Sequence, residues 1–255
     1  MRLNAVVLAG GRNSAEMQAA TGVENRALTP IGERTMLDYV ISALHQARSV
    51  GGIFVVGDVP PSDLYHCVRG GETLLDNLMA GIQAAQAEGD RILVSTSDIP
   101  FLTPESVEDF LERALKSGGD LCCSYVPVAL CYAKFPEMKR TAVTLREGRM
   151  TLGNLMLVNP RFLLAHQETI LQAYAARKSP LKMAGLLGWG LLGRLLLAQF
   201  VSPSFLPIAT LENGVSRLLG NGGRAVGIQS EYPEIGTDID RPEDVALAQR
   251  ALSNE

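Results

Sequence analysis

The segment that decides the fold is Asn4-Ala-Val-Val-Leu-Ala-Gly-Gly-Arg12, in which a short apolar run ends in two glycines and an arginine. A second arginine follows in Asn25-Arg-Ala-Leu-Thr-Pro-Ile31. A strand that ends in glycine lets backbone N–H groups approach a phosphate without an intervening Cβ, and arginine donates paired hydrogen bonds to phosphate oxygens. The segment lacks the G-x-G-x-x-G and G-x-x-x-x-G-K-[ST] patterns. It therefore predicts a phosphate or nucleotide site of another type.

Composition sets the limits of the fold and of the partners. The chain has 255 residues, of which 47% are hydrophobic, enough for one large α/β domain with a sizeable core. Its formal net charge is −4 and it has no run of Lys and Arg, which argues against nucleic acid as a main partner. No leader pattern precedes the first strand, so we expect a cytoplasmic protein. The four cysteines form no C-x-x-C pair and are expected to be buried, reduced thiols.

Apolar, β-branched runs alternate with helical patterns along the chain. Strands are expected at 5–8, 53–57, 92–95, 121–126, 142–145, 155–158 and 225–228, and helices at 35–47, 73–87 and 104–116. Strands that alternate with helices indicate parallel β-α-β units and a sheet covered on both faces. The predicted fold class is therefore α/β, with three α/β/α layers and a mostly parallel sheet. The segment Arg146-Glu-Gly-Arg149 predicts a hairpin turn between two short strands.

A mainly helical insertion is predicted over residues 178–223 of a single domain that spans 1–255, because strand character resumes at Ala225. Residues 183–201 are nearly all apolar but include Arg194. A spanning helix needs about 20 apolar residues, and an arginine near the bilayer centre costs roughly 2.5–3.5 kcal/mol. The favoured interpretation is a helical pair that covers the core. The alternative is a surface for a membrane or for a second copy, and both a monomer and a homodimer stay open.

Acidic side chains follow two of the predicted strands. Asp98 stands in Ser95-Thr-Ser-Asp-Ile-Pro-Phe-Leu102, directly after a buried strand, at the sheet edge where open α/β folds bind ligands. Asp238 and Asp240 alternate along Gly236-Thr-Asp-Ile-Asp240 and so face the same side. Magnesium prefers one or two carboxylates together with substrate phosphates. Asp98, completed by Asp238 or Asp240, is thus a candidate site for Mg²⁺ or Mn²⁺, although each acid could instead cap a turn or a helix.

A third segment, Gly70-Gly-Glu-Thr-Leu-Leu-Asp-Asn-Leu-Met-Ala-Gly81, places two glycines before a predicted helix. The first turns of that helix offer Thr73 and Asn77, and Gly81 indicates close packing against the helix. The segment is either an ordinary loop and helix start or the floor of a nucleobase site, touched by Gly70, Gly71, Thr73 and Asn77.

In this order, these segments resemble the nucleotidyltransferase superfamily that includes the molybdenum cofactor guanylyltransferases and the methylerythritol phosphate cytidylyltransferases. The resemblance covers about residues 1–126 and 225–252. Leu8, Ala9, Gly10 and Gly11 resemble the phosphate loop of that family, and 25–32 its K-x-L-x-x-x-G element. Residues 70–81 resemble its base-contacting segment, 97–102 its metal-aspartate motif and 238–244 its D-x-D-x-P-E-D ending. The middle of the chain is similar to a bacterial subgroup of that family.

This resemblance implies a Rossmann-like nucleotidyltransferase fold and transfer of a nucleoside monophosphate from a nucleoside triphosphate (NTP) to a small-molecule acceptor, with release of pyrophosphate. Arg12 and Arg26 would neutralise charge as the catalytic cations, and the metal would bridge phosphate oxygens. Two positions depart from the family pattern. Ala15-Glu16 replace a later arginine of the loop, and Arg26 replaces a lysine, which is not a neutral exchange at a tight phosphate site.

Two other functions stay open on the sequence. A glycosyltransferase of related fold would use a nucleotide sugar, but it would hold its metal with Asp-x-Asp after a middle strand, where this chain has Asp98 and no second acid two residues on. A nucleotide-binding regulator without turnover would fit the two departures. The base and the acceptor are not identified by the sequence.

Overall fold

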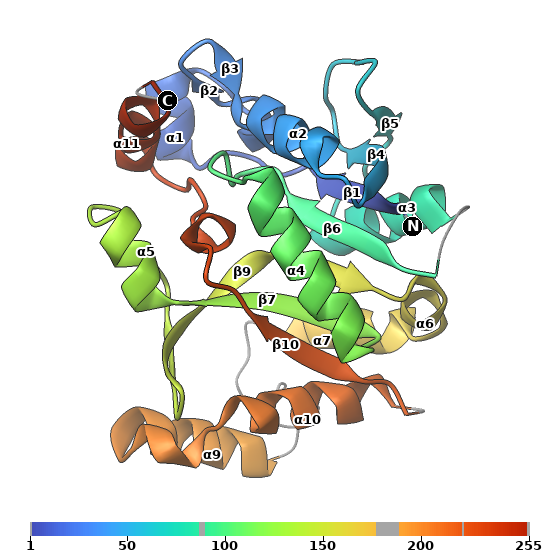
Figure 1. The fold of residues 1–255 in the computed structure, drawn as a ribbon, viewed down its shortest axis with the longest axis vertical. Coiled ribbons are helices and arrows are strands. Elements are labelled where there is room, and N and C mark those ends of the chain that lie inside the picture. Colours follow the sequence, from blue (N-terminus) through green and yellow to red (C-terminus); the bar gives the residue numbers. More distant parts are fainter. Residues whose placement is uncertain (1, 87–89, 177–188, 221, 254–255) are drawn as a thin grey trace.

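The central sheet of the computed structural model is mostly parallel, as predicted (Figure 1). The structure describes residues 2–86, 90–176, 189–220 and 222–253. Within these residues the sheet has eight strands in the order β10-β7-β9-β6-β1-β4-β5, with β8 paired to β9. The bounds are β1 Leu3–Leu8, β4 Val50–Val56, β5 His66–Val68, β6 Ile92–Thr96, β7 Leu121–Pro127, β8 Val143–Leu145, β9 Gly148–Val158 and β10 Ala225–Gln229. Strand β9 runs antiparallel to its neighbours β6, β7 and β8, and the other pairs are parallel.

The register of the central strands brings three chain segments to one edge. Leu8 at the end of β1 is paired with Val56 of β4 on one side and with Thr96 of β6 on the other. Because these strands are parallel and end together, the segments that follow them leave the sheet side by side. This edge is the carboxyl edge, where open α/β sheets bind ligands.

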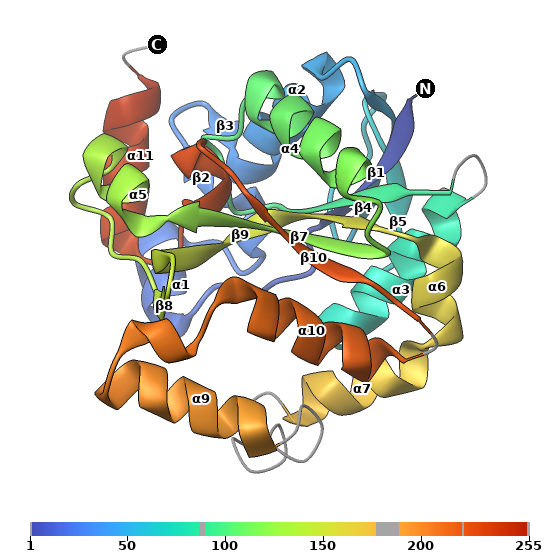
Figure 2. The same ribbon diagram turned by 60° about the horizontal axis from the view of Figure 1, so that its bottom comes forward.

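Helices cover both faces of the sheet, which Figure 2 shows in edge view. The upper face in that view carries α2 (Met36–Gln46) and α4 (Pro104–Ser117), and the lower face carries α3 (Leu74–Ala85), α6 (Pro160–Ala165), α7 (Gln167–Ala176) and α10 (Ile208–Leu219). Beside the sheet, α1 (Ala15–Thr21) contacts α11 (Pro242–Leu252), and α5 (Val128–Lys134) follows β7. The small ladder of β2 (Pro30–Ile31) and β3 (Arg34–Thr35) lies between α1 and α2 in sequence.

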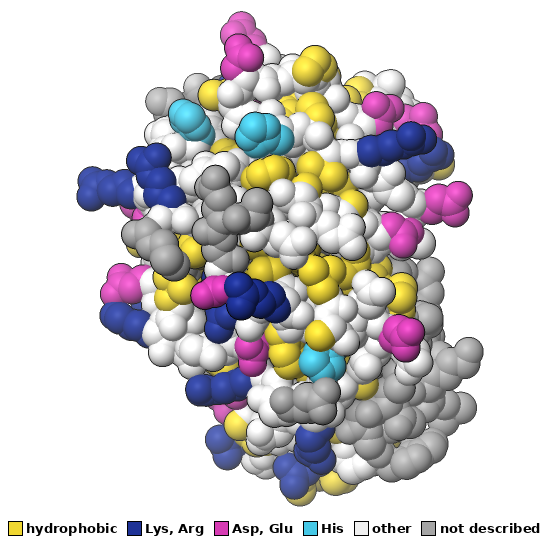
Figure 3. Space-filling model, turned by 90° about the vertical axis from the view of Figure 1, so that its right-hand side faces the viewer, with side chains coloured by type: hydrophobic (Ala, Val, Ile, Leu, Met, Phe, Trp, Pro, Cys, Tyr) yellow, Lys and Arg dark blue, Asp and Glu magenta, His cyan; other side chains and the backbone are white. Residues whose placement is uncertain are grey.

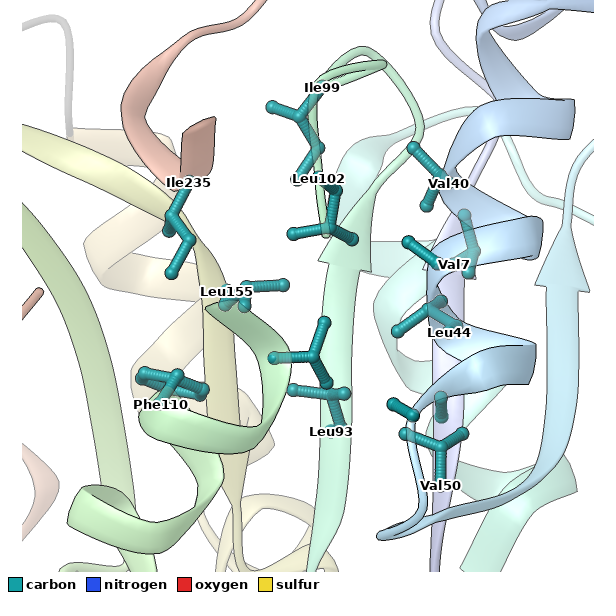
Figure 4. Packing of buried hydrophobic residues seen from close by; sticks show 14 of the residues in the cluster. Val7, Val40, Leu44, Val50, Leu93, Ile99, Leu102, Phe110, Leu155 and Ile235 are labelled. Atoms are coloured by element: carbon teal, nitrogen blue, oxygen red, sulfur yellow. The ribbon is translucent and has the colours of Figure 1, made fainter. Parts of the chain in front are cut away.

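The core follows from the alternation of side chains along β1. Val7 points into the cluster that packs against α2 and α4, where Leu44 and Phe110 are fully buried (Figure 4). Val6 points to the opposite face and packs under α3. A Cβ at Gly81 of α3 would collide with the side chains of Val6 and Val56, so the predicted close approach at this glycine is confirmed.

Helix starts agree with the sequence patterns. Thr35, Thr73 and Thr103 each cap a helix through a reciprocal capping box, and Pro104 occupies the first turn of α4. Gly118 ends α4 with a left-handed φ of 68°. The predicted turn at 146–149 is confirmed, because β8 and β9 pair antiparallel with Leu145 opposite Gly148.

The predicted insertion falls partly outside the described residues, which omit 177–188. Its described part holds α9 (Trp189–Phe200), the short 3-10 helix η3 (Pro203–Phe205) and α10. No helix among the described residues is long and apolar enough to cross a membrane. Phe200 and Val201 are 81% and 69% exposed, so the end of α9 presents apolar surface. The extent of the insertion and the single-domain organisation remain predictions.

The surface at the right-hand side of Figure 1 mixes charges of both signs with apolar side chains (Figure 3). One expectation about the surface is wrong: of the four cysteines, Cys67 is exposed on the short strand β5. This strand is the last in the order of the sheet, so it is paired on one side only.

Candidate functional site

A cavity of about 820 Å³ lies where β1, β4 and the loop before α3 come together. Five glycines contribute to its wall, and backbone makes up much of that wall. The lining residues are Gly10, Gly11, Arg12, Glu24, Asn25, Leu28, Gly57, Asp58, Arg69, Gly70, Gly71, Glu72 and Asn77. The structure thus brings the predicted phosphate loop and the predicted base-contacting segment to one cavity.

Close backbone packing explains why glycine is needed at the centre of this wall. Gly57, directly after β4, has a φ of 151°, and a Cβ there would lie 2.6 Å from the backbone carbonyl of Ala9. A Cβ at Gly70 would lie 2.7 Å from Asn77 Oδ1, and one at Gly10 would collide with Asn77 Nδ2. The amide of Asn77 is therefore enclosed between two glycines. Its Oδ1 accepts a hydrogen bond of 2.7 Å from the backbone N–H of Gly71, and the residue is 5% exposed.

The other predicted loop residues occupy different positions. Leu8 and Ala9 are buried and are not among the lining residues, and the Ala9 N–H is bonded to the carbonyl of Val56 at 2.8 Å. Arg12 lines the cavity but its side chain is 79% exposed and pairs with Glu24 at 2.9 Å. Thr73 caps α3 through Asp76 and is not among the lining residues. Its predicted contact with a base remains a prediction.

Several lining residues were not among the predicted site residues. Asn25 donates a 2.8 Å hydrogen bond from Nδ2 to the backbone carbonyl of Asp58, which ties the second loop to the end of β4. Arg69 precedes the two glycines and adds a cation to the wall. The signal that could have found Asp58 is its place two residues after the end of a central parallel strand.

Ala15 and Glu16, which depart from the family's loop pattern, have a local structural role. Ser14 caps helix α1, and Ala15 and Glu16 form the first turn of that helix. An acid in the first turn stabilises a helix start through the helix dipole. These two residues therefore belong to a helix start, next to the loop that carries Arg12.

Beside the cavity, Arg26 joins two of the predicted acids. Its Nη1 donates to Asp98 Oδ2 at 3.1 Å and to Asp240 Oδ1 at 2.7 Å. Asp98 is held after β6, and the backbone N–H of Ile239 bonds to its carbonyl at 2.9 Å, which docks the late acidic segment against this edge. Two acids far apart in the sequence thus meet at one nitrogen atom.

The third predicted acid, Asp238, has a different partner. Arg140, whose side chain is 4% exposed, donates from Nη1 to Asp238 Oδ1 at 2.6 Å and also contacts the Asp238 carbonyl. Burial, together with the neighbouring Asp240 and Asp98, raises the pKa of Asp238 to about 7, and Arg140 acts in the opposite direction. The three acids are therefore close enough to influence one another. Arg140 was not predicted, because no motif surrounds it.

The acid pair suits a hard divalent ion that also binds phosphate. Asp98 Oδ1 is buried and accepts no hydrogen bond from the described residues, so it has acceptor capacity for a ligand. Within the described residues, no group of three or more His, Cys, Asp or Glu could hold a metal by itself. Asp98 and Asp240 provide two carboxylates, which is what Mg²⁺ takes when substrate phosphates complete its shell.

Comparisons with known proteins agree with this architecture. The family model of the MobA-like NTP transferase domain matches residues 5–175. A solved structure described as a hypothetical transferase from Thermus thermophilus is 36% identical, with a TM-score of 0.80, and the match covers 96% of this chain and 100% of that one. No curated protein matches the chain.

More distant structures share the fold. The 2-C-methyl-D-erythritol 4-phosphate cytidylyltransferase from Thermus thermophilus is 18% identical, with a TM-score of 0.57 and full coverage of both chains. A CMP:2-keto-3-deoxy-manno-octonic acid synthetase complexed with CTP is 14% identical, with a TM-score of 0.58, over 100% of this chain and 99% of that one.

The family match spans more than half of the residues and includes the whole glycine-lined cavity, so the chain belongs to the MobA-like NTP transferase domain family.

Proposed function

We propose that this protein transfers a nucleoside monophosphate from an NTP to a phosphate- or hydroxyl-bearing small molecule and releases pyrophosphate. The observation that carries the proposal is the position of Arg26. Its backbone N–H bonds to the Gly11 carbonyl at 2.9 Å, and its guanidinium reaches Asp98 and Asp240. One residue therefore connects an anion cavity to a carboxylate pair, as phosphoryl transfer needs.

In this proposal the triphosphate lies over Gly10 and Gly11. Backbone approach is unhindered at Gly11, where a Cβ would meet no atom of the described residues within 4 Å. The base lies toward Gly70, Gly71 and Asn77. The enclosed amide of Asn77 keeps that part of the wall rigid, because its oxygen is bonded to Gly71 N–H. Arg12, which is exposed at the cavity, adds positive charge for the phosphates.

The reaction is an in-line displacement at the α-phosphorus. A new bond forms between the acceptor oxygen and the α-phosphorus, and the bond from the α-phosphorus to the bridging oxygen breaks, so its electron pair leaves with pyrophosphate. A phosphate acceptor is already an anion and needs no general base, whereas a hydroxyl acceptor gives its proton to water. The protein contributes positioning and charge neutralisation through Arg12 and Arg26.

Asp98 and Asp240, with Asp238 beside them, are the residues that would hold the divalent ion. Mg²⁺ or Mn²⁺ bound there would neutralise charge that develops on the phosphate oxygens. The orientation of this pair depends on Ile239, whose N–H bonds to the Asp98 carbonyl. This hydrogen bond keeps the late segment at the carboxyl edge of the sheet.

A thermal-shift panel of nucleoside triphosphates with Mg²⁺ tests the binding step. A ligand at about 100 times its dissociation constant adds roughly 2.7 kcal/mol of stability. The proposal expects at least one triphosphate to raise the melting temperature. That nucleotide is then incubated with phosphate- and hydroxyl-bearing acceptors, and pyrophosphate is measured. Cleavage of nucleotide sugars would indicate a glycosyltransferase, and binding without pyrophosphate over a broad panel would indicate a regulator.

The substitution Asp98→Asn is expected to lower pyrophosphate release by about 100-fold or more, because a neutral amide no longer balances a divalent ion. Asp109→Asn is the matched control, since Asp109 pairs with Arg113 on the surface of α4. Unaltered pyrophosphate release by the Asp98 variant would remove this carboxylate from the mechanism.

A further inference from the structure

Arg26 is positioned as a cation between the two carboxylates proposed to hold the metal. A single nitrogen, Nη1, donates to Asp98 Oδ2 at 3.1 Å and to Asp240 Oδ1 at 2.7 Å. The Arg26 side chain is 30% exposed and that of Asp98 is 14% exposed, so their contact is largely shielded from solvent, whereas the Asp240 side chain is 52% exposed. A positive charge thus already occupies the position between the two acids.

This ion pair is incomplete. Arginine and carboxylate pair most strongly through two parallel hydrogen bonds, but here one nitrogen serves both acids. Arg26 Nε and Asp98 Oδ1 are both buried and lack a hydrogen-bond partner in the described part of the chain. A buried polar atom without a partner is costly. Arg26 can therefore still donate hydrogen bonds to a ligand, and Asp98 can still accept a hydrogen bond or bind a cation.

The backbone of Arg26 belongs to the other half of the site. It begins the short 3-10 helix η1 (Arg26–Leu28), which Asn25 caps, and its N–H is bonded to the Gly11 carbonyl. The side chain thus starts at the glycine-lined cavity and ends at the acids. A triphosphate in that cavity offers the guanidinium several anionic oxygens near its point of attachment.

We propose that Arg26 stands in for the divalent ion when no nucleotide is bound, so that the acid pair takes up the metal together with the triphosphate and not before it. This inference rests on the proposed function. With the cavity empty, a divalent ion at Asp98 and Asp240 meets a like charge on Arg26 in a partly buried setting. When the triphosphate binds, Arg26 gains anionic partners, and the carboxylates become free for the ion.

The test is a titration of the nucleotide-free protein with Mn²⁺ alone. Binding is measured by the decrease of the electron paramagnetic resonance signal of free Mn²⁺. Wild type is expected to bind weakly, and Arg26→Ala about tenfold more tightly or better, which corresponds to at least roughly 1.4 kcal/mol. Arg26→Gln, which removes the charge but keeps a polar side chain, is expected to behave like Arg26→Ala. The double variant Arg26→Ala with Asp98→Asn is expected to lose the added affinity.

Arg113→Ala is the matched control, because Arg113 also pairs with a carboxylate, Asp109, through one nitrogen at 2.9 Å. It is expected to bind Mn²⁺ like wild type. The inference would be overturned if wild type and both Arg26 variants bound Mn²⁺ with equal affinity. It would also be overturned if the double variant Arg26→Ala with Asp98→Asn bound Mn²⁺ as tightly as Arg26→Ala alone. Circular dichroism of each variant establishes that it is folded.

A separate experiment tests the proposed function: triphosphate binding and pyrophosphate release are measured in the presence of Mg²⁺. A wild type that turns over NTP but binds Mn²⁺ alone as tightly as Arg26→Ala would refute the role of Arg26 and leave the activity in place. Tighter Mn²⁺ binding by Arg26→Ala in a protein that binds no triphosphate would refute the activity.

Discussion

Two cavities on the same sheet differ in what forms their walls. The cavity of about 820 Å³ at Gly10 and Gly11 is walled largely by glycine backbone and charged side chains. The cavity of about 240 Å³ between α10 and strands β7 and β10 is walled mainly by apolar side chains such as Leu211 and Val226. The first wall can donate N–H groups to anionic oxygen, and the second favours an apolar group. Triphosphate binding should therefore respond to changes in the first cavity and not to changes in the second.

The largest effect is expected from Gly57→Ala in the glycine-lined cavity. Its φ of 151° disfavours a side chain, and the new Cβ would lie 2.6 Å from the Ala9 carbonyl. We expect a loss of about 1–3 kcal/mol in the free energy of unfolding and a marked loss of triphosphate affinity. Urea denaturation and a nucleotide titration measure the two effects.

Gly11→Ala is the control for this variant, because a Cβ there would have no neighbour within 4 Å in the described part of the chain. Its free energy of unfolding should stay close to that of wild type. A Gly57 variant as stable as the Gly11 variant would show that the backbone approach between β4 and the phosphate loop is looser than described.

A smaller effect, confined to stability, is expected from Leu211→Ala in the apolar cavity. Leu211 is half-buried, so the loss should be about 1–2 kcal/mol, below the roughly 2–5 kcal/mol of a fully buried leucine. Triphosphate affinity, measured by titration calorimetry on the same sample, should not change. A drop in that affinity would couple the two cavities and contradict the comparison.

The smallest effect on stability is expected from Arg12→Ala. The ion pair of Arg12 with Glu24 is exposed, with 79% and 63% of the side chains accessible, and such surface changes alter stability by no more than about 0.5 kcal/mol. Triphosphate affinity should fall about fivefold, and the loss should shrink at high salt. An affinity that equals wild type at low salt would remove Arg12 from the phosphate site.

Local patterns predicted the parts of this molecule that depend on neighbouring residues. The strand at 92–95, the helices that begin near residues 35, 73 and 104, and the turn at 146–149 depend on apolar runs, helical spacing and glycine, which can be read directly in the sequence. The position of Asp98 at a carboxyl edge follows from the strand before it. The fold class was therefore predictable from these patterns, and the family from the resemblance of five segments in their order.

Long-range pairing was not predictable in the same way. Arg140 meets Asp238 across 98 positions of the chain, and Arg26 meets Asp240 across 214. No motif specifies such partners, because they depend on how loops return to the sheet edge. The sequence presented Arg26 as a phosphate ligand, whereas the structure places its guanidinium on two carboxylates.

The most direct test of the central claim is a crystal structure with a triphosphate and Mn²⁺, in which anomalous scattering locates the metal. The account predicts phosphates over Gly10 and Gly11, an anomalous peak beside Asp98, and the Arg26 guanidinium moved from the carboxylates to the phosphates. Phosphates bound away from the glycine-lined cavity, or a metal far from Asp98, would contradict it.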